Sequence, residues 1–360
     1  MKKKYIIWAL MVVFTASMVF TGVGCGTTAT TETTATETTA TETVAEETTA
    51  TETVAEETTV AGDEEEIRIV LSSQFEPQPN VFSWMFGMEV AAKQMGCAVE
   101  HFGPTSNAVA DQIDQLNSII ASEPDGIALI ITDAAAFTDT IATMNEQGIP
   151  WGTFNTGFMG IDEKQLFYVG ADHYASGRAI AEYALANAGF EIKNSLTLNQ
   201  QPGHSALDAR TRGELDVMHE HGLTGDEIDA SLSLDECLAR TKAYLIEHPD
   251  TGVIFTNGGA INAMAAQAVD ELDLKDKVVL ALHDADTWTC DAIKDGTALA
   301  TSEQQFFLQG YLSVVNLYNY IKWGSKPVEN NVTGPNIIDK SNVDRLVKLN
   351  GAIAEVYGSS

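Results

Sequence analysis

The sequence predicts an α/β fold made of two doubly wound, Rossmann-like lobes. Three observations support this prediction. Short apolar runs alternate with amphipathic stretches of helical length, glycines and prolines lie between them, and the series begins a second time near the middle of the chain. Alternation of strands and helices is typical of parallel sheets that helices cover on both faces.

The first series contains four strand-like runs separated by helical patterns. Gly96 and Gly148 are placed to end helices, and the sequence Glu-Pro-Asp-Gly at 123–126 predicts a turn. The predicted strands are residues 67–71, 98–102, 126–131 and 150–154, and the predicted helices end near Met95 or span 108–122 and 137–147.

The second series follows residues 168–172 and opens with a predicted helix at 176–188. Doubly wound sheets bind ligands beyond the carboxyl ends of their strands, so two such sheets predict a site in the cleft between them. The further predicted strands are residues 195–199, 227–230, 252–256, 278–282 and 298–301.

Residues 1–25 predict export of the chain. Three lysines precede an apolar run that extends to about Phe20, and the sequence Thr-Gly-Val-Gly then leads to Cys25. This pattern is similar to a bacterial lipoprotein signal peptide, in which the cysteine is lipidated and becomes the mature N-terminus. An uncleaved anchor helix is the alternative, and both interpretations place the remaining chain outside the cytoplasm.

Residues 26–66 predict a disordered tether. They consist almost entirely of Thr, Ala, Glu and Val, and the sequence TETVAEETT at 41–49 recurs at 51–59. The segment holds twelve acidic residues and no basic one. Such a composition has little to bury and repels itself, so we expect an extended spacer.

The charge of the chain excludes one class of partner. Twenty Lys and Arg residues face 51 Asp and Glu residues, which gives a formal net charge of -31. A surface this acidic repels phosphate backbones, so we expect no nucleic-acid partner. Cys97, Cys237 and Cys290 lack the spacing of a metal site, and we expect small buried residues, with one disulfide as the alternative.

Polar residues collect where the predicted strands end. Each of them alone could be a turn or helix-capping residue, but the carboxyl ends of parallel strands meet at one edge of a sheet. Together they predict a site suited to a ligand rich in hydroxyl groups. The positions are 72–74, 132–133, 155–156, 199–201, 256–257 and 283–284.

Four segments resemble a type I periplasmic binding protein of the ribose and simple-sugar class, the receptor of an ABC importer. They are GIPWGTFNTG at 148–157, FYVGADHYASGRAIAEY at 167–183, ALDARTRGEL at 206–215 and TSEQQFFLQGYLSV at 301–314. The resemblance extends from Ile67 to about Val347. It implies two lobes joined by a three-strand hinge, with residues 67–171 and 305–333 in the N-terminal lobe and 172–304 and 334–360 in the C-terminal lobe.

The resemblance also implies a set of ligand-binding residues. A carboxylate can accept hydrogen bonds from two adjacent hydroxyls, a guanidinium donates in a planar fork, and an amide can both donate and accept. Gln74 and Asp133 are further candidates because they lie at predicted strand ends. The residues that match the family's positions are Asn155, Arg212, Asn257, Asp284 and Gln304.

An aromatic wall is also expected, because the C–H edges of sugars stack on aromatic rings. The family's usual aromatic pair is displaced here, so the candidates are Phe82, Trp84 and Phe75. His283 stands where the family usually has Phe and either contacts the ligand or is a partly buried histidine. Phe306 replaces the family's proline after the two glutamines, which puts the rigidity of that crossing in doubt.

The expected function is binding without catalysis, cofactor or metal. The resemblance implies a monomer, anchored by its lipid to the outer face of the cytoplasmic membrane. It would close around a neutral sugar or polyol and deliver it to ABC permease subunits. Two alternatives stay open: a chemotaxis or signal-molecule receptor of the same fold, and an exported sugar-acting enzyme, for which we find no nucleophile or metal motif.

Overall fold

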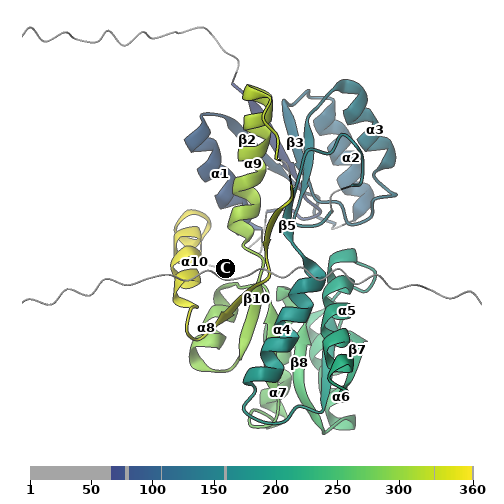
Figure 1. Ribbon diagram of the computed structural model, residues 1–360, viewed down its shortest axis with the longest axis vertical. Helices are drawn as coiled ribbons and strands as arrows, with labels where there is room; N and C mark the ends of the chain where they lie inside the picture. Colours follow the sequence, from purple (N-terminus) through teal and green to yellow (C-terminus); the bar gives the residue numbers. More distant parts are fainter. Residues whose placement is uncertain (1–65, 78–80, 107, 158–159, 328, 359–360) are drawn as a thin grey trace, which may run out of the picture. The chain divides into compact units, whose positions relative to one another are not determined.

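The computed structural model describes residues 66–77, 81–106, 108–157, 160–327 and 329–358. The predicted signal peptide with Cys25, and the predicted tether except for its last residue, lie outside this described part. Two six-stranded sheets form its framework, and helices cover both faces of each (Figure 1). Among the described helices, none is both long enough and apolar enough to cross a bilayer.

The first sheet is parallel throughout, and its strand order is β11-β5-β4-β3-β1-β2. Its strands are β1 (Arg68–Ser72), β2 (Ala98–Phe102), β3 (Gly126–Leu129), β4 (Trp151–Phe154), β5 (Tyr168–Ala171) and β11 (Asn331–Gly334). Its helices are α1 (Phe82–Met95), α2 (Val109–Ile120), α3 (Thr138–Gln147) and α9 (Phe306–Trp323).

The second sheet has the order β12-β10-β9-β8-β6-β7, and only β12 runs antiparallel to its neighbour. Its strands are β6 (Asn194–Asn199), β7 (Thr224–Asp229), β8 (Thr251–Thr256), β9 (Val279–His283), β10 (Ala300–Glu303) and β12 (Asn336–Asp339). The helices of this lobe are α4 (His173–Asn187), α5 (Ser205–Glu220), α6 (Leu234–Glu247), α7 (Asn262–Glu271), α8 (Thr287–Asp295) and α10 (Asp344–Tyr357), with a short 3-10 turn at Gly259–Ile261.

Each sheet separates two apolar layers, because successive side chains of a strand point to opposite faces. In β1, Ile69 and Leu71 pack with α1 and α9, whereas Val70 packs with α2 and α3. In the second sheet, Ile254 and Phe255 of β8 belong to different layers in the same way. The continuous apolar runs in the sequence are therefore strands that are buried on both faces.

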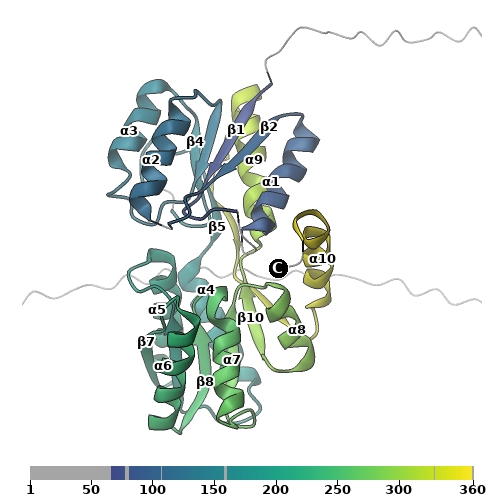
Figure 2. The same ribbon diagram turned by 180° about the vertical axis from the view of Figure 1, so that it is seen from behind.

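The chain passes between the two sheets three times. It leaves β5 for α4, leaves β10 for α9, and connects β11 directly to β12 (Figure 2). The fold class predicted from the sequence, two doubly wound lobes joined by three crossing segments, is confirmed. The two carboxyl edges consequently face the region where the chain crosses.

The elements differ from their predicted limits in ways that have local causes. Helix α4 begins three residues earlier than predicted because the Asp172 carboxylate accepts a hydrogen bond from the backbone N–H of Ala175 and caps the helix. Strand β7 begins at Thr224, earlier than predicted, because an edge strand with exposed residues needs no continuous apolar run. Cys97, Cys237 and Cys290 are buried and unbridged.

Candidate ligand-binding site

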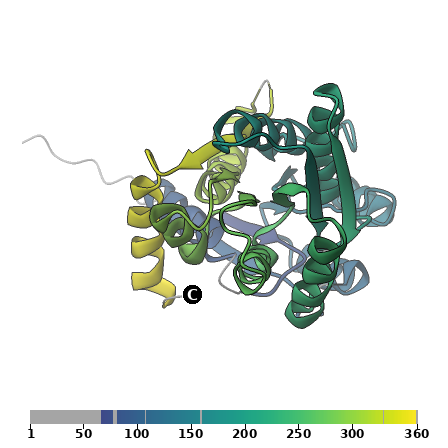
Figure 3. The same ribbon diagram turned by 90° about the horizontal axis from the view of Figure 1, so that it is seen from below.

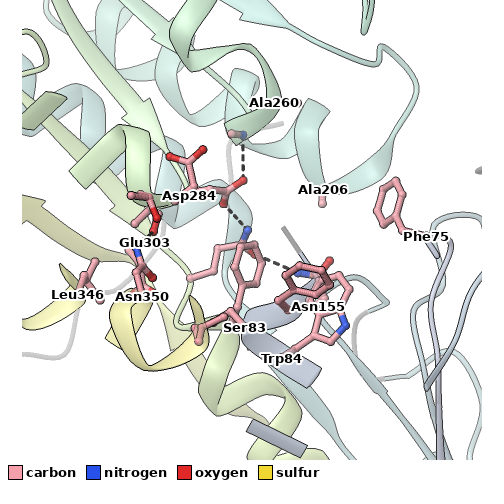
Figure 4. Close-up of a pocket in the computed structure, with 18 of the residues that line it drawn as sticks. Phe75, Ser83, Trp84, Asn155, Ala206, Ala260, Asp284, Glu303, Leu346 and Asn350 are labelled. Atoms are coloured by element: carbon pink, nitrogen blue, oxygen red, sulfur yellow. Dashed lines mark hydrogen bonds between the residues drawn. The ribbon is translucent and has the colours of Figure 1, made fainter. Parts of the chain in front are cut away.

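A cavity of about 510 Å³ lies between the two sheets, and residues of both lobes and of α10 line it. Polar side chains occupy its central region, and Asp284, Asn155 and Glu303 are among those seen in Figure 4. Most of the other polar lining residues come from loops that follow strands, and the rest come from helices. The full set is Gln74, Ser83, Thr156, His173, Gln200, Gln201, His204, Arg210, Asp286, Thr287, Gln304 and Asn350.

Asn155 follows β4 directly and adopts a left-handed backbone conformation with φ 58°. Its Nδ2 donates to Gln309 Oε1 at 3.0 Å and to Gln304 Oε1 at 3.4 Å. Its carbonyl oxygen lies 3.0 Å from the Tyr168 hydroxyl and 2.9 Å from His173 Nε2. These contacts hold a strained residue in place, which fixes the direction of its side chain at the cavity.

Asp284 follows β9 and has the same conformation, with φ 65°. Its carboxylate accepts hydrogen bonds from the backbone N–H of Gly259 at 3.1 Å and from Gln304 Nε2 at 2.6 Å. The side chain keeps 19% of its surface exposed. Asp284 is therefore oriented by two lobe residues while it still presents acceptor capacity to the cavity.

Arg210 is the buried cation of the site. Its side chain is 2% exposed, Nη1 donates to the Asn257 carbonyl at 2.7 Å, and the Asp284 carboxylate lies 3.6 Å away. Its Nε has no hydrogen-bond partner among the described residues. A buried donor without a partner carries a free-energy cost.

Two glycines determine how closely α5 approaches its neighbour α4. A Cβ atom on Gly177 would lie 2.0 Å from the Arg210 carbonyl oxygen, and one on Gly213 would lie 2.3 Å from the Tyr174 carbonyl oxygen. Only residues without a side chain allow this spacing. The small residues in the sequence thus place Arg210 against the cavity.

The structure places the predicted Arg212 outside the site. It is exposed, and its guanidinium lies over the Tyr174 ring at 5.2 Å from the ring centroid. Residues two apart on a helix point to nearly opposite sides, so only one of the two arginines can face the cavity. Ala206, Leu207 and Glu214 lie three or four residues from Arg210 and share its buried face of the helix. This helical periodicity was the signal in the sequence that Arg210, and not Arg212, points inward.

Three other candidates do not line the cavity. Asn257 is buried behind Arg210, and its Oδ1 accepts from the Gln200 backbone N–H at 3.1 Å. His283 is fully buried, with Nδ1 2.8 Å from the Thr256 carbonyl, because neighbouring strand residues point to opposite faces. Asp133 accepts from the Ala135 backbone N–H at 3.0 Å and stabilises a turn.

The remaining candidates lie at the cavity, and the two lobes contact each other beside it. Gln74, Phe82, Trp84, Asn155, Asp284 and Gln304 all line it, as does Phe75. Gln74 Nε2 lies 3.4 Å from His204 Nε2, and the Ser205 hydroxyl donates to the Thr132 carbonyl at 3.3 Å, so these contacts join the two lobes. Nothing in the sequence identified His204 as a site residue, because its contact with Gln74 forms only when the other lobe lies beside it.

Trp84 and Gln200 add two further polar atoms without partners. Trp84 packs edge-on against Phe154 and Phe306, with ring centroids 5.7 Å and 5.6 Å apart. Its indole Nε1 and the Gln200 Oε1 are buried and have no hydrogen-bond partner in the described part of the chain. Trp84, Gln200 and Arg210 all line the cavity, and the three unpartnered atoms themselves have almost no accessible surface.

Burial shifts the pKa values of three further groups that line the cavity, His204, His173 and Glu303. Desolvation, with a contribution from Arg210, lowers the pKa of His204 to about 4 and that of His173 to about 3. Burial raises the pKa of Glu303 to about 7. The two histidines are therefore neutral at pH 7, and the opposite charges of Arg210 and Asp284 lie 3.6 Å apart at the cavity.

Comparison with known proteins shows the family. The model of the periplasmic binding protein domain matches residues 69–326. This chain belongs to that family.

Among relatives, the xylose/arabinose-binding protein XylF of Sulfolobus acidocaldarius is 21% identical over 291 residues, which cover 77% of this chain and 72% of the relative. Solved structures also resemble the fold. The periplasmic sugar-binding protein of an ABC sugar transporter from Legionella pneumophila is 25% identical, with a TM-score of 0.69, covering 74% of this chain and 98% of that one. The arabinose-binding protein AraP of Geobacillus stearothermophilus is 25% identical, with a TM-score of 0.67, covering 78% and 99%.

Proposed function

We propose that this chain is the sugar- or polyol-binding receptor of an ABC importer and that it binds its ligand in the cavity between the lobes. The observation that carries the proposal is that charged and amide side chains from both lobes line one cavity. Arg210 supplies guanidinium donors, Asp284 supplies carboxylate acceptors, and Asn155 supplies an amide. A ligand with several hydroxyl groups satisfies both kinds of atom, because a hydroxyl donates and accepts.

Each polar residue has a distinct part in recognition. Asp284 accepts from ligand hydroxyls, Arg210 donates through its guanidinium, and Asn155 orients the hydroxyls on the side of the other lobe. Trp84 and Phe82 supply apolar faces for ring C–H groups. A ligand that lacks one of these hydroxyls leaves a buried group unpaired, which is the basis of discrimination.

Closure would use the three crossing segments as hinges, near residues 171–172, 304–305 and 334, at the proposed limits of the lobes. Side chains link two of these segments: Gln305 Nε2 donates to the Thr333 carbonyl at 2.6 Å, and Gln309 Nε2 donates to the Thr333 hydroxyl at 3.3 Å. These links connect the crossing that carries Phe306, where the family has proline, to the neighbouring crossing. Ligand contacts to both lobes favour the closed form, which a permease would recognise.

The N-terminal segments would determine where the receptor works. We propose that Cys25 carries the lipid anchor and that residues 26–66 extend the body away from the membrane, outside the cytoplasm. Importer subunits in the same membrane would then receive the ligand from a receptor that stays nearby. Lipidated and Cys25→Ser chains should differ in membrane association but not in ligand affinity.

The test of this function is a melting-temperature measurement with a panel of pentoses, hexoses, inositol and linear polyols, together with analysis of each compound for chemical change. We expect one compound or a small group to raise the melting temperature and to be recovered intact. A ligand at 100 times its Kd stabilises the folded state by about 2.7 kcal/mol. A panel without effect at millimolar concentration, or conversion of the bound compound, would contradict the proposal.

A further inference from the structure

Helix α10 forms one wall of the cavity and contacts both lobes. It packs against α1 of the first lobe and α8 of the second (Figures 1 and 2). At its end, the Tyr357 ring stacks on the Phe82 ring, with centroids 4.8 Å apart and an interplanar angle of 14°. The view from below shows the yellow α10 at one margin of the described body (Figure 3).

The face of α10 at the cavity is an apolar stripe. Its members follow helical spacing, three and four residues apart, so they project from one side of the helix. They are Leu346, Leu349, Asn350, Ile353 and Ala354. The amide of Asn350, the polar member, donates to the Ala285 carbonyl at 3.1 Å, so its donor is already occupied.

This stripe lies at one end of the cavity. Figure 4 shows Leu346, Asn350 and Glu303 on one side, Ala206 and Phe75 on the opposite side, and Asp284 between them. Trp288 and Phe82 also line the cavity. The cavity therefore has the apolar side chains of α10 at one end, beside the polar groups of Glu303 and Asn350.

The polar side chains near Asp284 and the apolar side chains of α10 suit different parts of a ligand. Sugar hydroxyls placed against leucine and isoleucine side chains would lose their hydrogen bonds to water and gain none, at a cost in free energy. The volume of about 510 Å³ lies within the range of roughly 300–1,000 Å³ that encloses drug-sized ligands, more than one sugar ring requires. The group that fits the α10 end is apolar and continues from the sugar.

We infer that this receptor binds O-glycosides, with the sugar at Arg210 and Asp284 and an apolar aglycone, aryl or alkyl, against the stripe of α10. The inference rests on the proposed function and adds a second subsite to it. Leu349 is the residue that tests the subsite best, because it lines the cavity from the stripe and does not belong to the buried core of the second lobe.

The test is calorimetric titration of the full-length protein with D-xylose, L-arabinose and D-glucose, and with the methyl and phenyl glycosides of each in both anomeric forms. We expect one phenyl glycoside to bind at least tenfold more tightly than the corresponding methyl glycoside, because each buried methylene group contributes about fourfold in affinity. Leu349→Ser should lower this phenyl-to-methyl ratio several-fold. Leu349→Trp, which fills the subsite, should lower it as well.

Val356→Ser is the matched control on the same helix. Val356 is 55% exposed and does not line the cavity, so its substitution should leave the ratio unchanged. Melting curves of each variant show whether it folds, and the two opposite changes at Leu349 keep the test valid if one of them does not.

The outcomes separate this inference from the function on which it rests. Binding of a free sugar without any preference for its phenyl glycosides would overturn the aglycone subsite and leave the proposed function intact. A phenyl preference that neither Leu349 variant reduces would also overturn it, because the aglycone would then lie elsewhere. Failure of all these compounds and of the wider sugar and polyol panel to bind would contradict both.

Discussion

At the scale of single residues, the site depends on side chains whose directions are fixed by neighbours. Asn155 and Asp284 both adopt left-handed backbone conformations at strand ends, and each is held by two or more hydrogen bonds. Gln304 lies between them, donating to Asp284 and accepting from Asn155. One amide side chain thus couples polar groups that come from different lobes, so ligand contacts on one lobe orient those on the other.

Arg210 and Arg212 provide a matched pair for testing the site. Arg210→Lys keeps the positive charge but removes guanidinium donors, and a hydrogen bond to a charged group contributes about 1.5–3 kcal/mol. We therefore expect Arg210→Lys to weaken binding by roughly 10- to 150-fold. Arg212→Lys should have no measurable effect, because the side chain is exposed on the far side of the helix.

Titration calorimetry with any compound that raises the melting temperature measures both variants. Equal losses of affinity in the two variants would contradict the assignment of the binding arginine to Arg210. A loss confined to Arg212→Lys would restore the assignment that the sequence motif suggested.

At the scale of elements, the spacing of α4 and α5 determines whether the binding arginine reaches the cavity. Gly177 and Gly213 let the backbones approach until added Cβ atoms would collide with carbonyl oxygens. Helix α10 is placed differently, by a side-chain stack on α1 and by packing of Leu346 and Val347 against the core of the second lobe. The first contact is rigid backbone packing, whereas the second involves side chains that can adjust.

Substitution of two helical glycines by alanine separates packing from helix propensity. Gly177→Ala should destabilise the protein by roughly 1–3 kcal/mol through overpacking and should weaken ligand binding, because α5 must move away. Gly351→Ala, in α10, meets no atom within 4 Å and should stabilise the protein by up to about 1 kcal/mol. Chemical denaturation measures both changes, and a neutral Gly177→Ala would show that the α4–α5 spacing is not critical.

The sequence predicted most of the buried strands of both lobes, because their apolar runs need no tertiary information, but β5 was not among the predicted strands. It did not predict β11, β12 or α10 as separate elements. The two strands have four residues each and mixed composition, and the position of α10 depends on contacts with α1, more than 200 residues earlier. The strand-end rule located Asn155, Asp284 and Gln74 correctly at the cavity, but it could not distinguish Asp284 from the inward-pointing His283 without the pleat of β9.

At the scale of the whole molecule, two sheets with facing carboxyl edges and three crossing segments form one cavity with opposed fixed charges and neutral histidines. The net charge of -31 is the basis for expecting no nucleic-acid partner, but it does not describe this cavity, where Arg210 faces Asp284. Family membership accounts for the architecture. The proposed ligand class rests on the hydrogen-bond donors and acceptors of both lobes that line the cavity.

The most direct measurement is equilibrium dialysis of the purified protein against a mixture of neutral sugars, polyols, amino acids and nucleosides, followed by mass spectrometry of the retained solutes. The account predicts retention of one or a few neutral polyhydroxylated compounds, near one molecule per chain, and loss of that retention in Arg210→Lys. Retention of amino acids or nucleosides alone, or of no sugar or polyol, would contradict it.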